Sequence, residues 1–202
     1  MVNRKAYLLT TDVTLPRTIS SKKVLETVGL DVTLFQAIPG QTSIHSNKNS
    51  HMKIIETIRA GEDEWAYIFE DDIDVLEPIT LDEIVQYEPI SEHFFFLGIC
   101  KRGYYGTVKP TRSSINGHLV CKVAGHVRGA HAFAFSKAGA AEFIRFSQEF
   151  SDEPYLDVLL DKFSFIHPAT IVRFDLESYL DDHRGIFFQD RKSWEPVIKE
   201  EL

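Results

Sequence analysis

Short apolar runs bounded by polar clusters recur along the chain, and this pattern predicts buried β-strands. The predicted strands are residues 6–10, 32–35, 65–69, 94–98, 119–123, 132–135 and 169–172. The clearest is WAYIF at 65–69, because it is apolar throughout and leads directly into three acidic residues.

Between these runs, apolar residues recur at intervals of three and four, which predicts helices. The predicted helices are residues 18–28, 47–60, 80–85, 136–146 and one after Pro154. Gly29 and Gly61 supply stop signals, and residues 47–50 supply N-cap candidates for the second helix. Residues 101–117 are rich in Gly, Ser, Thr and Arg, so we expect a mobile loop or an open hairpin there.

Strands that alternate with helices favour an α/β fold with a mainly parallel central sheet flanked by helices. The 202 residues are enough to bury a full hydrophobic core, so we expect a single domain. The proportions of 44% hydrophobic and 26% charged residues are ordinary for a soluble protein.

The net charge of −8 argues against nucleic acid as a partner, because phosphate backbones require clustered Lys and Arg. A nucleotide ligand remains compatible with it, since a divalent cation held by carboxylates can make the phosphate contact.

No run of 18 apolar residues occurs, so we expect no transmembrane segment. The N-terminus is typical of a first strand rather than of a signal peptide. Cys100 and Cys121 are too few for a disulfide framework. We expect two reduced thiols and a cytoplasmic location, with a single bridge as the alternative.

Three consecutive carboxylates, Glu70, Asp71 and Asp72, follow the clearest strand. They repel one another unless water, hydrogen bonds or a cation compensates. Ligands gather at the carboxyl ends of strands in open α/β sheets, and Mg²⁺ or Mn²⁺ prefers carboxylates together with substrate phosphates. We therefore predict a metal site, in which Asp74 could share. A solvated acidic turn is the alternative.

Several ordered segments resemble glycosyltransferase family 25, whose members build lipopolysaccharide and lipooligosaccharide outer cores. The resemblance covers roughly the first 160 residues. Its segments are Tyr7-Leu8-Leu9-Thr10 with Arg17 downstream, Phe35-Gln36-Ala37-Ile38-Pro39-Gly40, Ser50-His51, the strand at 65–69 with Glu70-Asp71-Asp72, and residues 129–140. The chain departs from the family at Thr10-Thr11-Asp12, where an asparagine–leucine–aspartate-like sequence is usual.

The resemblance implies a GT-A-like fold, a nucleotide-sugar donor such as a UDP-sugar, a divalent metal (often Mn²⁺) and inverting transfer, frequently of galactose. The acceptor would be a glycan or glycolipid. On this basis residues 1–100 form the donor-binding part and residues 101–202 the acceptor-side part.

Inverting transfer needs a base that deprotonates the acceptor hydroxyl. We assign this role to Asp157, which resembles an aspartate that the family carries after its serine–glycine–alanine helix. The competing carboxylates are Asp152, Glu153 and Asp161. Each could instead be a carboxylate that favours the dipole of a helix N-terminus.

The predicted metal ligands are Glu70, Asp72 and His183, and a surface turn is the alternative for His183. The predicted donor-binding residues are Thr10, Arg17, Ser50, His51, Asp71, Gly129 and His131. A helix start exposes N–H groups that favour anions, which motivates Ser50 and His51. The glycine-bracketed segment 125–129 lets a ligand approach the backbone, although it could be a plain hairpin turn.

Two other functions use the same acidic residues. A metal-dependent phosphoryl hydrolase would need a second ligand set, for which residues 181–183 are the candidate. A non-catalytic protein that binds nucleotide-sugars or glycans is the other alternative. Peripheral association with a membrane through a partner stays open in each case.

Overall fold

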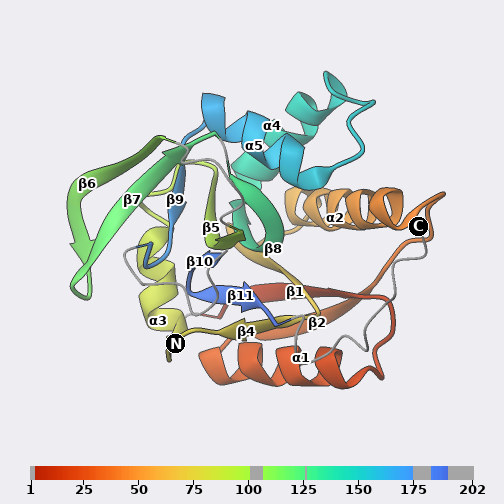
Figure 1. Ribbon diagram of the computed structural model, residues 1–202, viewed down its shortest axis with the longest axis horizontal. Coiled ribbons are helices and arrows are strands. Elements are labelled where there is room, and N and C mark those ends of the chain that lie inside the picture. Colours follow the sequence, from red (N-terminus) through yellow and green to blue (C-terminus); the bar gives the residue numbers. More distant parts are fainter. Residues whose placement is uncertain (1–2, 101–106, 126, 175–182, 191–202) are drawn as a thin grey trace.

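In the computed structural model the described residues are 3–100, 107–125, 127–174 and 183–190. Figure 1 shows their arrangement. In chain order the elements are β1 (Lys5–Thr10), α1 (Pro16–Val28), β2 (Asp31–Gln36), α2 (Ser43–Ala60), β3 (Trp65–Glu70), β4 (Ile73–Val75), α3 (Leu81–Ile84), the 3₁₀ turn η1 (Val85–Tyr87), β5 (Phe94–Cys100), β6 (Thr107–Ile115), β7 (His118–Ala124), β8 (Arg128–Ser136), α4 (Lys137–Gln148), α5 (Leu156–Ile166), β9 (Ala169–Ile171), β10 (His183–Gly185) and β11 (Phe187–Gln189).

The described strands form a nine-stranded sheet in the order β2-β1-β3-β8-β5-β9-β7-β6, with β10 beside β5. A separate two-stranded sheet joins β4 and β11. Strands β2, β1 and β3 pair in parallel, as do β5 and β9. The remaining pairs are antiparallel. The predicted α/β class is confirmed, but the sheet is mixed rather than mainly parallel. An apolar run reports burial on both faces and does not encode strand direction, so β8 could not be recognised as the inserted antiparallel strand.

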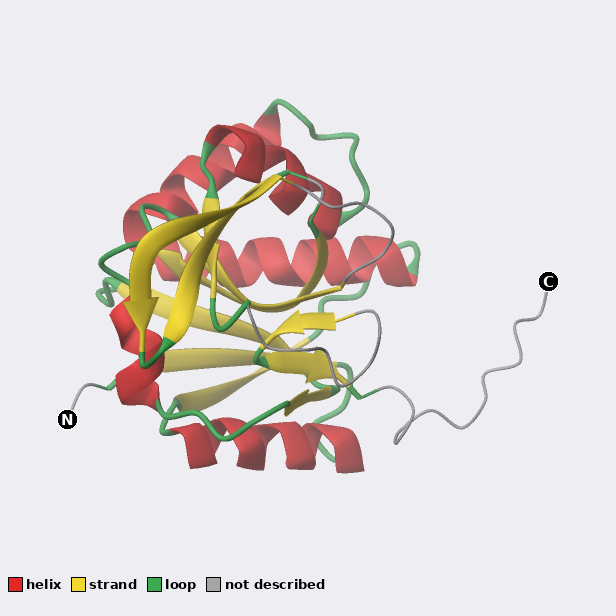
Figure 2. Cartoon of the chain, turned by 60° about the vertical axis from the view of Figure 1, so that its left-hand side comes forward, coloured by secondary structure: helices red, strands yellow, loops and turns green. Residues whose placement is uncertain are grey.

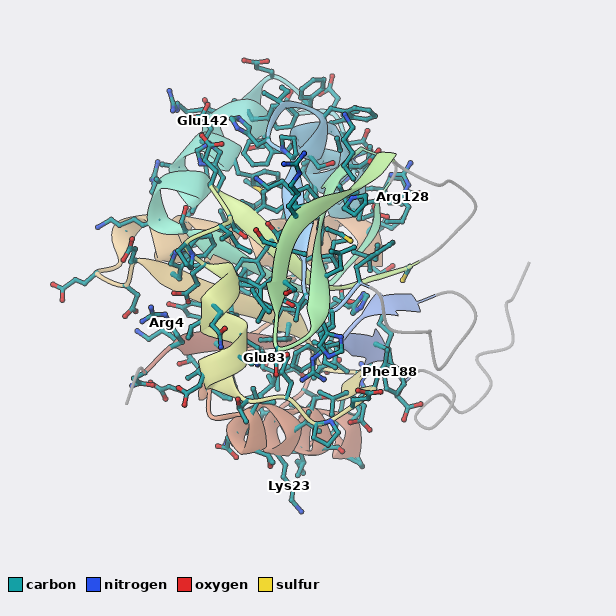
Figure 3. All side chains as sticks on the ribbon, turned by 90° about the vertical axis from the view of Figure 1, so that its left-hand side faces the viewer. Arg4, Lys23, Glu83, Arg128, Glu142 and Phe188 are labelled. Atoms are coloured by element: carbon teal, nitrogen blue, oxygen red, sulfur yellow. The ribbon has the colours of Figure 1, made fainter. Side chains whose placement is uncertain are left out.

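Helices cover both faces of the sheet (Figures 1 and 2). Helix α1 lies on one face, and α2, α4 and α5 lie on the other. Side chains alternate accordingly along β3: Ala66 and Ile68 join the core beneath α2, α4 and α5, whereas Tyr67 and Phe69 join the core beneath α1. Lys23 of α1 extends outward on the side opposite to Glu142 of α4 (Figure 3).

The order of the first three strands reverses around β1. The chain moves from β1 through α1 to β2, and then returns through α2 to β3 on the other side of β1. In open α/β sheets such a reversal marks the crevice where ligands bind, outside the carboxyl ends of the strands. Strands β5 and β9 run in the same direction as β3, so we call this side of the sheet the carboxyl edge and its opposite the amino edge.

Two helices differ from their predicted form. Helix α2 begins at Ser43 rather than 47, because the Thr42 hydroxyl accepts a hydrogen bond from the His45 N–H. Ser50 therefore lies inside the helix. In α1, Ile19 is 58% exposed and the hydroxyl residues Thr18 and Ser21 face inward with Leu25 and Val28.

The predicted loop or hairpin at 101–117 is a β-hairpin in its described part, where β6 pairs with β7 through a turn at Asn116 and Gly117. Residues 101–106 lie outside the described structure. Among the described residues β7 and β8 do not pair, so they form no hairpin around segment 125–129, of which residue 126 lies outside the described structure. The short strands β4, β10 and β11 were not predicted, because three residues carry little periodicity; β9 is as short, but Val172 extends its apolar run.

Cys100 and Cys121 are not joined by a disulfide, as the favoured interpretation predicted, although Cys100 is only half-buried. Within the described residues, none of the helices combines the length and the apolar character that crossing a membrane requires.

Candidate functional site

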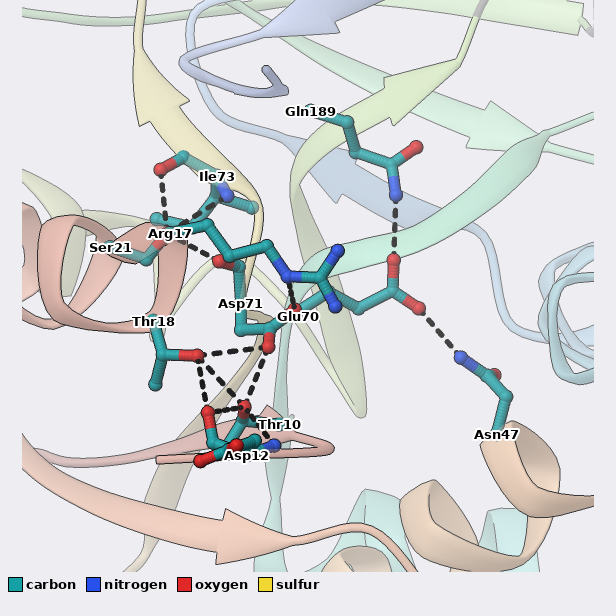
Figure 4. Close-up of polar contacts among 10 residues, drawn as sticks. All are labelled: Thr10, Asp12, Arg17, Thr18, Ser21, Asn47, Glu70, Asp71, Ile73 and Gln189. Carbon is teal, nitrogen blue, oxygen red and sulfur yellow. Dashed lines mark hydrogen bonds and ion pairs between the residues drawn. The ribbon is translucent and has the colours of Figure 1, made fainter. Parts of the chain in front are cut away.

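The three predicted carboxylates stand at the carboxyl edge. Glu70 is the last residue of β3, beside the end of β1, and Asp71 and Asp72 form a turn into β4. We call residues 70–72 the acidic turn. Figure 4 shows that its carboxylates diverge: Asp71 points toward α1, whereas Glu70 points toward Asn47 of α2 and Gln189 of β11.

Asp71 is 7% exposed and its charge is compensated from β1 and α1. The hydroxyls of Thr10 and Thr18 donate to its Oδ2 at 2.6 and 3.0 Å. Arg17 Nε lies 3.2 Å from its Oδ1 as an ion pair. Hydrogen bonds and an opposite charge of this kind make a buried carboxylate tolerable. Both oxygens of Asp71 thus bind within the protein.

The backbone of the acidic turn is fixed by Ser21, which is fully buried in α1. Its hydroxyl accepts from the Ile73 N–H at 3.1 Å. It also lies 3.0 Å from the carbonyl oxygens of Asp71 and Ile73, to one of which it donates. The inner face of α1 therefore holds the turn through hydroxyls rather than through apolar packing.

Glu70 is held by two amides. Asn47 Nδ2 donates to its Oε1 at 2.8 Å, and Gln189 Nε2 donates to its Oε2 at 2.7 Å. A carboxylate can accept about four hydrogen bonds or metal contacts, so the two amides can stay in place while Glu70 makes other contacts. Asp72 is half-buried, and its carbonyl accepts from the Asp190 N–H at 2.6 Å. The segment at the end of β11 therefore also contacts the acidic turn.

Positive charge also reaches this edge. The N-termini of α1 and α2 lie here, because each helix follows a strand that ends at the carboxyl edge. Helix N-termini carry unpaired N–H groups and a partial positive charge, which favour phosphate. Arg17, in the first turn of α1, adds a guanidinium.

The structure places most other predicted residues at the same edge. Gly129 and His131 belong to the first part of β8, whose pairing with β3 reaches Phe69 and Ala132. His131 is fully buried, with Nε2 3.1 Å from the Phe187 carbonyl. The backbone of His183 pairs with Cys100 at the end of β5. The His183 side chain and residues 181–182 lie outside the described part.

Ser50 and His51 are buried beneath this edge instead of lining it. The Ser50 hydroxyl donates to the Ser46 carbonyl at 2.6 Å and accepts from the Ile38 N–H at 2.8 Å. The His51 ring stacks on Phe133, and its Nδ1 lies 2.9 Å from the Asn47 carbonyl. Burial lowers the pKa of His51 to about 4, so the ring is neutral near neutral pH.

Asp157 lies half-buried in the first turn of α5. The loop before α5 is tied to the N-terminal half of α2, since Lys48 Nζ donates to the carbonyls of Ser151 (3.1 Å) and Glu153. Lys48 adjoins Asn47, which contacts Glu70. This chain of contacts brings the start of α5 toward the carboxyl edge.

A divalent cation at the acidic turn would need ligand atoms from a bound substrate as well as from the protein. Among the described residues, the turn contributes no set of three His, Cys, Asp or Glu ligand atoms within 4.8 Å of one another. Asp71 binds Thr10, Thr18 and Arg17, so Glu70 and Asp72 are the other carboxylates of the turn that a cation could use. Mg²⁺ and Mn²⁺ are commonly held by one or two carboxylates plus substrate phosphates, so the residue types of this turn are compatible with such a cation.

The sequence did not identify four residues of this site: Thr18, Ser21, Asn47 and Gln189. Thr18 and Ser21 carry a signal, since two hydroxyl residues sit three apart on what becomes the inner face of α1. Asn47 was considered only as an N-cap. Gln189 lies 119 residues from Glu70, and nothing in its local sequence marks it.

A broad groove of about 910 Å³ lies at the amino edge, away from the acidic turn. Its lining mixes charges of both signs, with Arg59 and Lys137 among glutamates such as Glu62 and Glu64. The acidic turn is the stronger candidate, because it stands where the strand order reverses and polar groups of β1 and α1 hold the buried Asp71 there.

The chain matches no protein-family model and no curated protein sequence. Among solved structures it is similar to the CTP:phosphocholine cytidylyltransferase LicC from Streptococcus pneumoniae, with a TM-score of 0.49 and 9% identity over 98% of this chain and 100% of that one. It is also similar to A197 from STIV (TM-score 0.44, 8% identity, 71% and 68% of the two chains). The glycosyltransferase GlyE from S. pneumoniae TIGR4 gives a TM-score of 0.38 at 12% identity over 82% of this chain and 37% of GlyE.

At TM-scores below 0.5 these likenesses do not extend to function. The resemblance to glycosyltransferase family 25 rests on the quoted sequence segments and stays a prediction.

Proposed function

We propose that this chain is a metal-dependent transferase that takes a nucleotide-sugar as donor and holds the donor diphosphate at the acidic turn. The observation that carries the proposal is the position of that turn. It stands at the carboxyl end of β3, where the strand order reverses around β1.

The charges at this edge support a diphosphate ligand. Arg17 and the N-termini of α1 and α2 favour anions, whereas Glu70 and Asp72 would repel a diphosphate that arrived alone. A bound divalent cation would resolve this conflict by offsetting the negative charge of the carboxylates and the diphosphate. When bound, Mn²⁺ or Mg²⁺ would neutralise charge that develops on the leaving diphosphate. Glu70 and Asp72 would hold it, while Asp71 holds the turn.

The finer assignments follow from the sequence resemblance. They are a UDP-sugar donor, possible use of galactose, inversion at the anomeric carbon, and a glycan or glycolipid acceptor. In this scheme Asp157 accepts the proton of the acceptor hydroxyl. Its place in the first turn of α5 also suits a simple role at the helix dipole, so its function needs a kinetic test.

The experiment is a Mn²⁺-dependent hydrolysis and transfer assay over a panel of UDP-sugars, with Asp72→Asn and Asp157→Asn. We expect Asp72→Asn to lower the Mn²⁺-dependent rate by more than about 100-fold, because it removes the negative charge of a proposed direct ligand. Asp157→Asn should lower transfer while leaving UDP binding intact. Asp63→Asn is the matched control, since Asp63 is an exposed aspartate before the other end of β3.

Equal rates in Asp72→Asn and the wild type would show that the metal is misplaced. Nucleotide binding without turnover of any donor and acceptor would replace the transferase with a non-catalytic nucleotide-sugar-binding protein. Release of phosphate from simple phosphoesters would favour a phosphoryl hydrolase.

A further inference from the structure

Two histidines and a glutamate converge at the amino edge, on the side of the sheet opposite to the acidic turn. One ligand atom each from Glu92, His93 and His167 lies within 4.8 Å of the other two. Within the described residues, this is the only group of three His, Cys, Asp or Glu that meets the criterion. It belongs to none of the segments that carry the proposed function.

The backbone at His93 is fixed. His93 directly precedes β5, and its carbonyl accepts from the Ser136 N–H at 2.9 Å and from the Ser136 hydroxyl at 3.2 Å. Helix α4 approaches so closely that a Cβ at Gly139 would lie 2.0 Å from the His93 oxygen. The position of His93 is therefore set by packed elements and not by a loose loop.

His167 is held in a similar way. It caps the end of α5, where its N–H donates to the Phe163 carbonyl at 2.9 Å. Two residues later the chain enters β9, which pairs in parallel with β5. The ring centroids of His93 and His167 are 4.3 Å apart at an interplanar angle of 80°. Both rings pack against Phe163.

The chemistry of this cluster suits a cation that prefers nitrogen. Nδ1 of His93 is buried without a hydrogen-bond partner. Burying a polar atom in this way costs about 1–3 kcal/mol. Its Nε2 lies 3.7 Å from Glu92 Oε1. Burial, followed by the neighbouring His93, lowers the pKa of His167 and so favours the neutral ring that metals require.

We propose that Glu92, His93 and His167 form a binding site for Zn²⁺ or a similar borderline divalent cation. Two imidazoles and one carboxylate are a known Zn²⁺ ligand set, and three protein ligands leave a coordination position open. Tetrahedral Zn²⁺ needs its ligand atoms about 3.3 Å apart. Because the Glu92 side chain is 76% exposed, it can rotate to close the remaining distance. Glu92 also lines the groove at the amino edge, so the open position lies beside that groove.

The test is a Zn²⁺ titration of the metal-free full chain against a chromophoric chelator, with His167→Gln and Glu92→Gln. We expect the wild type to bind one equivalent, and each variant to bind it at least about tenfold more weakly. The matched controls are His45→Gln and Glu149→Gln, which remove an exposed histidine and an exposed glutamate away from the groove at the amino edge. The controls should bind Zn²⁺ like the wild type.

Co²⁺ substitution provides a second readout, because the Co²⁺ spectrum reports the coordination of the metal and not merely whether the protein is folded. We expect the visible absorption bands of Co²⁺ at low coordination number in the wild type and their loss in His167→Gln. If His167→Gln does not fold, Glu92→Gln decides, because its side chain is exposed. Equal Zn²⁺ affinity in the wild type and Glu92→Gln, or octahedral Co²⁺ spectra throughout, would overturn the site. UDP-sugar turnover reports on the acidic turn and not on this cluster, so failure of the proposed function can be distinguished from failure of the Zn²⁺ site.

Discussion

At the scale of single residues, Asp71 shows how a carboxylate is kept inside the protein next to two others. Thr10 and Thr18 donate to one oxygen and Arg17 faces the other, so no oxygen is left without compensation. This arrangement turns Asp71 away from Glu70, which points toward Asn47 and Gln189 (Figure 4).

Thr18→Val should therefore destabilise the protein. The change keeps the shape of the side chain but removes a donor from a buried carboxylate, which costs about 1–3 kcal/mol in the free energy of unfolding. Thr27→Val is the matched control on the same helix, because the Thr27 hydroxyl is exposed and should change stability by less than about 0.5 kcal/mol. Urea unfolding measures both. Equal values for the two variants would mean that Asp71 does not depend on Thr18.

His51 should make stability depend on pH. Its pKa of about 4 in the folded protein lies below the ordinary value of 6.5, so the unfolded chain binds the proton more readily. The contribution of His51 is fully present above pH 6.5 and is lost as pH falls toward 4. Between about pH 7.5 and pH 5 the loss amounts to about 2 kcal/mol.

His51→Gln should flatten this part of the pH profile, measured by urea unfolding at each pH. His45→Gln, which removes an exposed histidine near the start of the same helix, should leave the profile unchanged. An identical slope in the wild type and His51→Gln would show that another group titrates there.

At the scale of elements, the last described strands complete the site. Strand β10 pairs with β5, and β11 pairs with β4 and brings Gln189 to Glu70. This approach depends on Gly98 in β5, since a Cβ there would lie 2.0 Å from the Phe187 carbonyl and 2.6 Å from His131 Nε2. Glycine is thus required by close packing at this position.

Gly98→Ala should loosen β10 and β11 and destabilise the fold by about 2 kcal/mol or more, as overpacking of a dense interior does. Gly117→Ala is the contrasting variant, because it meets open space and carries only the cost of its positive φ, about 1 kcal/mol. Hydrogen exchange of the Ile186 and Asp190 amides reports the loosening directly. Protection that is unchanged in Gly98→Ala would contradict this role.

The sequence predicted where elements lie better than how they are joined. Apolar runs located β3, β5 and β8 because each is buried on both faces. The same runs could not show that β8 inserts antiparallel between β3 and β5, since direction depends on connections. In α1 the apolar spacing located the helix, but Ile19 is exposed and the inward face carries Thr18 and Ser21, whose hydroxyls contact the acidic turn.

At the scale of the whole molecule, the fold gathers residues that local patterns cannot connect. The acidic turn was recognisable because three carboxylates follow one apolar strand. Its partners Asn47 and Gln189 lie 23 and 119 residues from Glu70, so only the sheet topology brings them together. The same topology places the acidic turn and the Glu92, His93 and His167 cluster at opposite edges of one sheet.

Because the two proposed sites lie at opposite edges of the sheet, binding of a metal and a nucleotide at the acidic turn can be measured apart from Zn²⁺ binding at the other cluster. In the proposed site Glu70 and Asp72 alone would hold a cation incompletely, so Mn²⁺ and a nucleoside diphosphate should each strengthen the binding of the other. The most direct measurement is calorimetric titration of UDP into the wild-type chain with and without Mn²⁺. We predict that Mn²⁺ tightens UDP binding at least about tenfold, and that Asp72→Asn removes this gain. UDP affinity that is the same with and without Mn²⁺, or absent in both, would contradict the account.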